Sequence, residues 1–277
     1  MPGRMKYSVT CALQTDPNTP ILLGGVFSKN VRQAREIGYD AVELHTKDPS
    51  LENSGDIVRL CEKYGLAVSA IGTGKSYVID GLSLISDSNS NRESAVARLR
   101  EYIDLASATG SYVIVGCIRG NIPDLSKAEI YERRLADSLK ITLDYAVKKN
   151  VCVVLEAINR YENNYLNTAA EIVEFIQKYD LPMLRVMLDT FHMNIEEPDM
   201  LQAIHESREL LGYVHFADSN RLYPGAGHID FKSILKTLQI VNYRGYVGME
   251  YYPRPDGAAS AEKGLQYIKT LKEITAY

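Results

Sequence analysis

Four side chains that could hold a metal ion stand at the ends of short apolar runs in the second half of the chain. Glu156 ends VCVVLE, Asp189 ends LRVMLD, His215 lies near the end of GYVHF, and Glu250 ends YVGME. If these runs are parallel strands of one barrel, their carboxyl ends meet at one mouth. Three carboxylates and one imidazole would then lie close together, which predicts a metal site.

Three oxygen ligands and one nitrogen ligand suit a fairly hard divalent ion that keeps open coordination positions. Mn²⁺ is the ion we expect, with Co²⁺ or Mg²⁺ as alternatives. Any one of these residues could merely cap a helix or form a salt bridge at a strand end. Four of them after apolar runs on consecutive strands favour a shared ligand set instead.

Such a site suits the removal of a proton next to a carbonyl group. The ion acts as a Lewis acid on the carbonyl and a neighbouring hydroxyl, which stabilises the negative charge of an enediolate. Glu156 and Glu250 are the predicted catalytic residues, because strands five and eight are far enough apart to flank a substrate. One would take a proton and the other would return one on the opposite face. Asp189 and His215 are expected to be metal ligands only.

Three further polar residues follow the predicted ligands and are expected on loops at the same mouth. Glu162 lies in EAINRYE, His192 in LDTFHMN and Arg221 in HFADSNR. They can hydrogen-bond the hydroxyls and carbonyl of a polyhydroxylated substrate. A structural role for His192 and a surface salt bridge for Arg221 are the alternatives. His45, which ends AVELH, is a weaker candidate at the same mouth.

Eight short runs rich in apolar and β-branched residues alternate with longer segments of helical period. The runs begin at Lys6 (KYSVTC), Ala41 (AVELH), Leu66 (LAVSAIG), Tyr112 (YVIVGC), Val151 (VCVVLE), Leu184 (LRVMLD), Gly212 (GYVHF) and Tyr246 (YVGME). Apolar strands that are each followed by a helix predict a parallel sheet covered by helices. Eight such units, with no GxGxxG after the first, favour a single (β/α)₈ TIM barrel over an open sheet. We expect residues 1–277 to form one domain.

Two helix starts carry the S/T-x-x-E spacing of a capping box, at Ser126 and Glu129 and at Thr168 and Glu171. The segment GTGKSYVIDGLSL lacks the spacing of a P-loop. It is expected to be a flexible rim loop that covers the substrate.

Composition and charge exclude several classes of partner. The chain of 277 residues is 45% apolar and has a net charge of −4, so no excess of positive charge attracts nucleic acid. The four cysteines are scattered without a CxxC pair, which fits a reducing cytoplasm. The sequence has neither an apolar stretch of signal-peptide length at its start nor a membrane-spanning segment. We expect a soluble cytoplasmic protein with no membrane partner.

The sequence resembles the xylose isomerase-like sugar isomerase and epimerase superfamily. Within it, the likeness is to the ketose 3-epimerases typified by D-tagatose and D-psicose (allulose) 3-epimerases. It is concentrated in EAINRYE, LDTFHMNIEE, HFADSNRLYPGAGHIDF and the terminal GME, in matching order and spacing. Two features depart from those enzymes: the chain has no Trp, and IGTGKSYVIDGLSL looks more like relatives that act on keto-acid sugars or oxidised glycosides.

The resemblance implies an isomerase with Glu156 and Glu250 as acid/base pair and metal ligands, and Asp189 and His215 as the remaining ligands. It assigns substrate contacts to Glu162, His192 and Arg221. It also implies a metal such as Mn²⁺ or Co²⁺ and a homodimer or homotetramer.

The expected function is a metal-dependent epimerase that inverts a carbon next to a ketone, such as C3 of a ketose or keto-acid sugar. The same site could instead serve an aldose/ketose isomerase, or an epimerase or lyase of 3-keto-glycosides. An endonuclease IV-like metallonuclease is disfavoured, since the chain has five histidines and no basic stripe. A non-catalytic sugar-binding protein is the remaining alternative.

Overall fold

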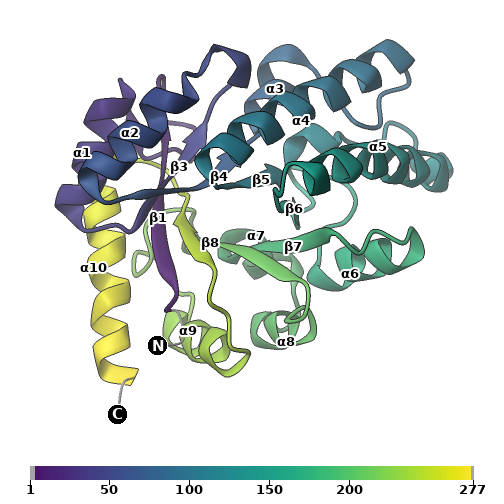
Figure 1. Ribbon diagram of the computed structural model, residues 1–277. Coiled ribbons are helices and arrows are strands. Elements are labelled where there is room, and N and C mark those ends of the chain that lie inside the picture. The colour runs from purple at the N-terminus through teal and green to yellow at the C-terminus, as the bar shows by residue number, and fades with distance from the viewer. Residues whose placement is uncertain (1–3, 276–277) are drawn as a thin grey trace.

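The computed structural model describes residues 4–275, and a closed ring of parallel strands forms its centre (Figure 1). Each strand pairs with its neighbours in chain order, and β1 also pairs with β9, which closes the barrel. The strands are β1 (Lys6–Ala12), β3 (Ala41–His45), β4 (Ala67–Gly72), β5 (Tyr112–Val115), β6 (Val153–Glu156), β7 (Leu184–Asp189), β8 (Leu211–Phe216) and β9 (Tyr246–Met249). The predicted fold class is therefore confirmed, and each predicted strand is present.

One short strand, β2 (Leu23–Gly24), was not predicted. It pairs with the last two residues of β1, beyond the point where the β1–β9 pairing ends. The hydroxyl of Thr10 links β9 to the start of β2, because it donates to the Met249 carbonyl (3.2 Å) and accepts from the N–H of Leu22, the residue before β2 (3.1 Å). β2 thus extends the barrel wall past the end of β9.

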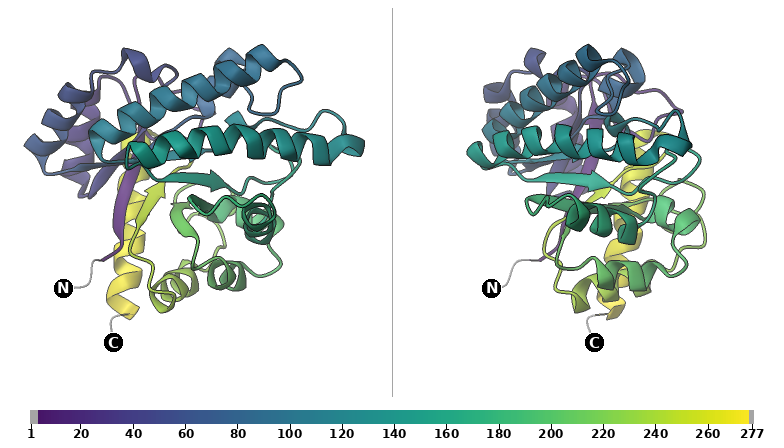
Figure 2. Two further views of the ribbon diagram at one scale, coloured as in Figure 1. Left: turned by 45° about the vertical axis from the view of Figure 1, so that its right-hand side comes forward. Right: turned by 90° about the vertical axis from the view of Figure 1, so that its right-hand side faces the viewer.

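Helices surround the barrel, and the two longest, α4 and α5, pack against each other along its outside (Figure 2). The helices are α1 (Phe27–Ile37), α2 (Ser54–Tyr64), α3 (Gly74–Asp80), α4 (Asn89–Thr109), α5 (Ala128–Lys148), α6 (Ala169–Lys178), α7 (Thr190–Glu196), α8 (Met200–Glu206), α9 (Phe231–Ile240) and α10 (Gly257–Thr275), with 3₁₀ turns η1 (Pro49–Leu51), η2 (Cys117–Arg119) and η3 (Leu125–Lys127). Among the described residues, no helix combines the length and apolar character needed to cross a bilayer.

Of the two predicted capping boxes, one is present and one is not. At the start of α6, the Glu171 N–H donates to the Thr168 hydroxyl (3.2 Å) and the Thr168 N–H donates to the Glu171 carboxylate (3.1 Å). Ser126 instead lies in the turn η3, and its hydroxyl donates to Asp124 (2.6 Å). The prediction for Ser126 was wrong because Asp124 caps this turn, and α5 begins two residues later, at Ala128.

The prediction that GTGKSYVIDGLSL forms a flexible loop was also wrong, because the middle of this segment forms the helix α3. The hydroxyl of Ser76 lies 2.9 Å from that of Tyr102 on α4, and Arg98 on α4 donates to Asp80 (3.2 Å). Side-chain contacts with α4 therefore hold this segment in place.

The barrel interior begins with an apolar layer and becomes polar toward the carboxyl ends of the strands. Five consecutive strands, β4 to β8, each contribute one buried residue to the layer: Ala70, Ile114, Val154, Met187 and Tyr213. A much larger apolar core fills the space between the strands and the helices. Buried polar side chains lie next to the Tyr213 hydroxyl, at the bottom of the mouth.

The two capping positions give a matched test of helix capping. Thr168→Ala should lower the free energy of unfolding by about 1 kcal/mol, because the Glu171 N–H loses its acceptor. Ser126→Ala should have a smaller effect, since Asp124 still caps its turn. Urea denaturation with an unchanged slope would measure both. Equal losses in the two variants would contradict the difference in capping.

Candidate metal centre

The structure brings the four predicted ligands together at the carboxyl end of the barrel. Glu156 and Asp189 end β6 and β7, His215 is the next-to-last residue of β8, and Glu250 directly follows β9. One potential ligand atom from each lies within 4.8 Å of the others, and all four residues are buried. The site therefore contains three carboxylates and one imidazole on four consecutive strands.

Two buried atoms in this group have no hydrogen-bond partner among the described residues, namely His215 Nδ1 and Asp189 Oδ2. His215 Nδ1 lies 3.3 Å from Glu250 Oε2 and 3.9 Å from Asp189 Oδ2. Leaving buried polar atoms unpaired costs free energy, and a cation shared by these atoms would remove that cost. The donor set of carboxylates and one imidazole nitrogen fits a hard divalent ion.

The pKa values of the carboxyl groups in this set also favour a cation at the site. Burial raises the pKa of Glu156 to about 8, and the nearby Glu250 and Asp189 carboxylates add to the shift. Burial also raises the pKa of Asp189 to about 6. At Glu250, burial acts in the same direction, but His215 and His45 outweigh it and hold the pKa below its usual range. A cation among these carboxylates would relieve their mutual repulsion.

Glu43 on β3 is a central residue that sequence reasoning missed. It is fully buried and accepts hydrogen bonds from His215 Nε2 (2.9 Å), His45 Nε2 (2.8 Å) and the Tyr213 hydroxyl (2.8 Å). Burial would raise the pKa of Glu43, but the two histidines overcome it and hold that pKa well below its usual range. A signal was present in AVELH, where a glutamate inside an apolar run shares one strand face with a histidine two residues later.

A second group of potential ligands consists of Glu43, His45 and Glu250, and it shares Glu250 with the first. Three donors already use the Glu43 carboxylate. The unpartnered atoms belong instead to Asp189 and His215. The first group is therefore the better place for a cation.

The predicted substrate contacts lie beside Glu156. Glu162 Oε1 accepts from Arg221 Nη1 (2.5 Å) and from Asn159 Nδ2 (3.1 Å). Asn159 Nδ2 also donates to His192 Nδ1 (2.6 Å), while His192 Nε2 lies 3.7 Å from Glu156 Oε1. Glu162, His192 and Arg221 thus form one connected set at the mouth.

The protonation of His192 follows from its surroundings. Burial, with a contribution from the charge of Arg221, holds its pKa well below the usual value, so the ring is neutral. An amide NH₂ can only donate, so Nδ1 of His192 accepts from Asn159 and the ring proton lies on Nε2. The ring therefore presents an N–H donor on the side of Glu156.

Arg221 is held rigidly by what surrounds its guanidinium. The group lies 4.8 Å from the centre of the Phe191 ring and 5.7 Å from that of Tyr252, and it pairs with Glu162. The salt bridge of Arg221, the alternative considered from the sequence, is thus part of the mouth rather than of the open surface, since the Arg221 side chain is only 11% exposed.

Arg119 is a second residue that sequence reasoning missed. Its guanidinium is fully buried and donates to the Glu156 carbonyl, to the Tyr165 carbonyl (3.1 Å) and to the Leu166 carbonyl (3.3 Å). It therefore ties the end of β6 to the loop that follows it. Nothing in its sequence context, CIRG, distinguishes an arginine that binds backbone carbonyls from a solvated one.

Three glycines near the mouth leave space for site side chains. A Cβ added at any of them would lie 2.6 Å from a site atom, which is closer than real Cβ contacts. The pairs are Gly72 with His45, Gly116 with Glu156, and Gly248 with His215. Gly72 and Gly248 thus make room for imidazole rings, whereas at Gly116 the close contact is with the terminal carboxylate oxygen of Glu156.

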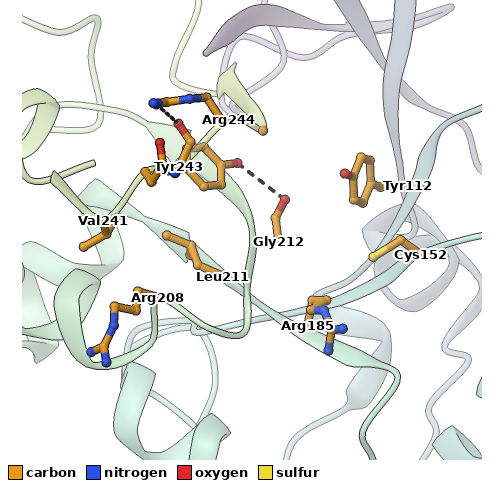
Figure 3. A pocket seen from close by; sticks show the side chains of 11 residues that line it. Tyr112, Cys152, Arg185, Arg208, Leu211, Gly212, Val241, Tyr243 and Arg244 are labelled. Carbon is orange, nitrogen blue, oxygen red and sulfur yellow. Dashed lines mark hydrogen bonds between the residues drawn. The ribbon is translucent and has the colours of Figure 1, made fainter. Parts of the chain in front are cut away.

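A separate cavity of about 260 Å³ opens at the other end of the barrel, where the strands begin (Figure 3). Arg185, Arg208 and Arg244 line it together with Tyr112 and Cys152. No Asp, Glu or His is among its lining residues, so it offers none of the donors of the metal centre.

The curated relatives are epimerases. The chain is 30% identical over 248 residues to 3-dehydro-D-guloside 4-epimerase of Escherichia coli (strain K12), covering 86% of this chain and 92% of the relative. It is 32% identical over 231 residues to L-ribulose 3-epimerase of Methylomonas sp. (strain DH-1), covering 81% and 78%.

Solved structures agree with this relationship. The apo form of 3-keto-D-glucoside 4-epimerase from E. coli superposes with a TM-score of 0.81 at 25% identity, covering 96% of this chain and all of that one. A D-allulose 3-epimerase from Methylomonas sp. has the same fold, with a TM-score of 0.81 at 24% identity over 98% and 99% of the two chains. Residues 31–271 match the family described as xylose isomerase-like TIM barrel. The chain belongs to the xylose isomerase-like TIM barrel family.

Proposed function

We propose that the protein is a divalent-metal-dependent sugar epimerase that inverts a carbon next to a ketone, such as C3 of a ketose or keto-acid sugar. The observation that carries this proposal is that Glu156 and Glu250 belong to a buried group of potential ligands. In the same group, one atom of Asp189 and one of His215 have no hydrogen-bond partner within residues 4–275. The relatives support it, since they are named as epimerases of ketoses and of a keto-glycoside.

Glu156, Asp189, His215 and Glu250 would hold one ion, and Mn²⁺ suits them best, with Co²⁺ or Mg²⁺ as alternatives. When bound, the ion supplies Lewis-acid stabilisation of the negative charge that develops on the substrate oxygens.

Glu156 and Glu250 would carry the two proton transfers. They stand at the ends of β6 and β9, which are separated by β7 and β8 around the barrel, so a sugar bound at the mouth would meet one carboxyl group on each face. One glutamate removes the proton from the carbon next to the ketone, and the other delivers a proton to the opposite face. Which glutamate acts first depends on the configuration of the incoming sugar.

His192, Glu162 and Arg221 would bind and orient the sugar. His192 offers its Nε2–H beside Glu156, where it can donate to a substrate oxygen. Arg221 can donate to a hydroxyl or to the carbonyl, since the Phe191 and Tyr252 rings and Glu162 fix its guanidinium. Fixed donors of this kind lower the cost of ordering the substrate.

A second candidate is epimerisation at C4 of a 3-keto-glycoside. The E. coli relative with that type of activity in its name matches 86% of this chain. The chain also has no Trp, which is a departure from the ketose 3-epimerases that its sequence resembles. Solvent deuterium would separate these reactions, because the label appears at the carbon that loses its proton.

We further propose that residues 1–277 act as one domain, in the cytoplasm, as a homodimer or homotetramer with no nucleic-acid partner. The four free cysteines fit a reducing compartment, and a net charge of −4 does not favour binding to a polyanion.

Removing either acid/base group should nearly abolish turnover. Glu156→Gln and Glu250→Gln should each lower kcat by on the order of 10²–10⁴, the usual worth of a proton-transfer group. Incorporation of deuterium from solvent, followed by NMR on a panel of ketoses, keto-acid sugars and oxidised glycosides with Mn²⁺, measures this loss.

The control for both variants is Glu209→Gln, which alters an 82% exposed glutamate outside the site and should leave kcat unchanged. Circular dichroism would show that each variant is folded. Normal turnover by a folded Glu156→Gln or Glu250→Gln protein would overturn the proposed roles.

Removal of the metal should both inactivate and destabilise the protein. At a Mn²⁺ concentration 100 times Kd, binding contributes about 2.7 kcal/mol of stability, which corresponds to on the order of 5–10 °C in Tm. Thermal unfolding after chelation, with and without added Mn²⁺, measures the shift.

Asp189→Asn is the matched control, because Asn can keep the hydrogen bond from the Phe191 N–H (2.7 Å) but is a weaker ligand. Its Tm should respond much less to Mn²⁺. A wild-type Tm that is identical with and without Mn²⁺ would contradict a metal centre here.

A further inference from the structure

We propose that Glu43 is a positioning residue of the metal centre, one that orients His215 toward the ion and holds His45 beside Glu250. This inference rests on the proposed metal-dependent function, but it concerns a residue outside both the predicted ligand set and the predicted acid/base pair. The argument depends on the hydrogen bonds of Glu43, on the residues that brace it and on the space around it.

The bond between Glu43 and His215 determines which imidazole nitrogen faces the other ligands. His215 Nε2 lies 3.0 Å and 2.9 Å from the two oxygens of the Glu43 carboxylate. An ionised carboxylate can only accept, so Nε2 carries the proton. The opposite nitrogen, Nδ1, points to Glu250 and Asp189 at 3.3 Å and 3.9 Å. A carboxylate behind a histidine fixes the tautomer and the ring orientation of a metal ligand in this way.

Glu43 is itself held from beneath by the barrel. The Tyr213 hydroxyl donates to Glu43 Oε2 (2.8 Å) and also lies 2.9 Å from the Ser8 hydroxyl and 2.8 Å from the Ser69 hydroxyl. Ser8 can donate to the Tyr213 hydroxyl, while the Ser69 hydroxyl donates to a main-chain carbonyl (3.2 Å). These four residues come from β1, β3, β4 and β8, so four strands fix the Glu43 carboxylate.

The space around the side chains of Glu43 and His215 is only just large enough for them. A Cβ at position 248 would lie 2.6 Å from His215 Cδ2 and 2.7 Å from Glu43 Oε2, so Gly248 leaves just enough room for both partners. The Tyr213 ring also packs edge-on against the His215 ring, with centroids 5.6 Å apart. The imidazole is therefore confined by contacts on its edge as well as by its hydrogen bond.

The second hydrogen bond of Glu43 is with His45, which lies beside the proposed acid/base residue Glu250. His45 Nε2 lies 2.8 Å from Glu43 Oε1 and 3.8 Å from Glu250 Oε1, and the ring packs onto Gly72. Glu43 thus holds one imidazole that binds the ion and another that lies beside Glu250. His45, a weak candidate from the sequence, acquires a role through Glu43.

The competing interpretation is that Glu43, His45 and Glu250 bind a second ion directly. In that case Glu43 would be a ligand, and each chain would bind two ions. A positioning role requires one ion per chain, with an affinity that depends on Glu43.

The test is titration of chelator-stripped protein with Mn²⁺ by isothermal calorimetry. Wild-type protein should bind one Mn²⁺ per chain, and Glu43→Gln should bind it about 10- to 100-fold more weakly. Tyr213→Phe keeps the Glu43 charge but removes its brace, so it should weaken binding by a smaller factor. Glu209→Gln, at an exposed glutamate, should bind as wild type does.

Three results would overturn the inference. The first is two Mn²⁺ per chain, and the second is an unchanged Kd in a folded Glu43→Gln protein. The third is a Tyr213→Phe protein with wild-type affinity beside a weakened Glu43→Gln, because charge alone would then explain the loss. If Glu43→Gln does not fold, Tyr213→Phe alone decides, with weaker binding in support and wild-type affinity against.

The calorimetry also keeps this inference separate from the proposed function. If the expected Mn²⁺ affinities are found but no keto-sugar exchanges a proton with solvent, Glu43 still positions the centre and the proposed epimerase activity fails. If wild-type protein epimerises a sugar and Glu43→Gln binds Mn²⁺ normally, the activity stands and the positioning role fails.

Discussion

The structure depends on how the barrel mouth accommodates buried negative charge. Glu43, Glu156, Asp189 and Glu250 all lie there with little or no access to water. Burying a charge is costly unless an opposite charge or hydrogen bonds compensate it. Glu43 has this compensation from two imidazoles and a tyrosine hydroxyl, whereas at Glu156 and Asp189 the cost of burial outweighs the favourable contacts and raises the pKa values. The imbalance is greatest at the point where a cation would complete the site.

The sequence was sufficient to predict features that depend only on position along a strand. A residue at the end of a parallel barrel strand must reach the mouth, so Glu156, Asp189 and Glu250 could be placed together without coordinates. The capping box of Thr168 is equally local, since its partner is three residues away. The rim helix α3 was missed because contacts with α4 hold it, and no pattern within the segment reports them.

Glu43 and Arg119 could not be assigned for a different reason. Glu43 acts on His215, which is 172 positions away in the chain, so its function appears only when β3 and β8 face each other across the barrel. Arg119 binds main-chain carbonyls, and any arginine side chain could do so. A sequence pattern locates side chains at the ends of strands more readily than the groups that hold those side chains in place.

The three glycines near the mouth change what a mutational scan of this protein should look like. Gly72, Gly116 and Gly248 have no functional group, yet each borders a charged or imidazole side chain so closely that a methyl group would force that side chain to shift. The smallest substitution available, glycine to alanine, therefore acts at the centre of the site as a steric wedge. A survey that ranks positions by the chemistry of their side chains would overlook these three. For an engineer who wants a new substrate, they mark the part of the scaffold to leave untouched.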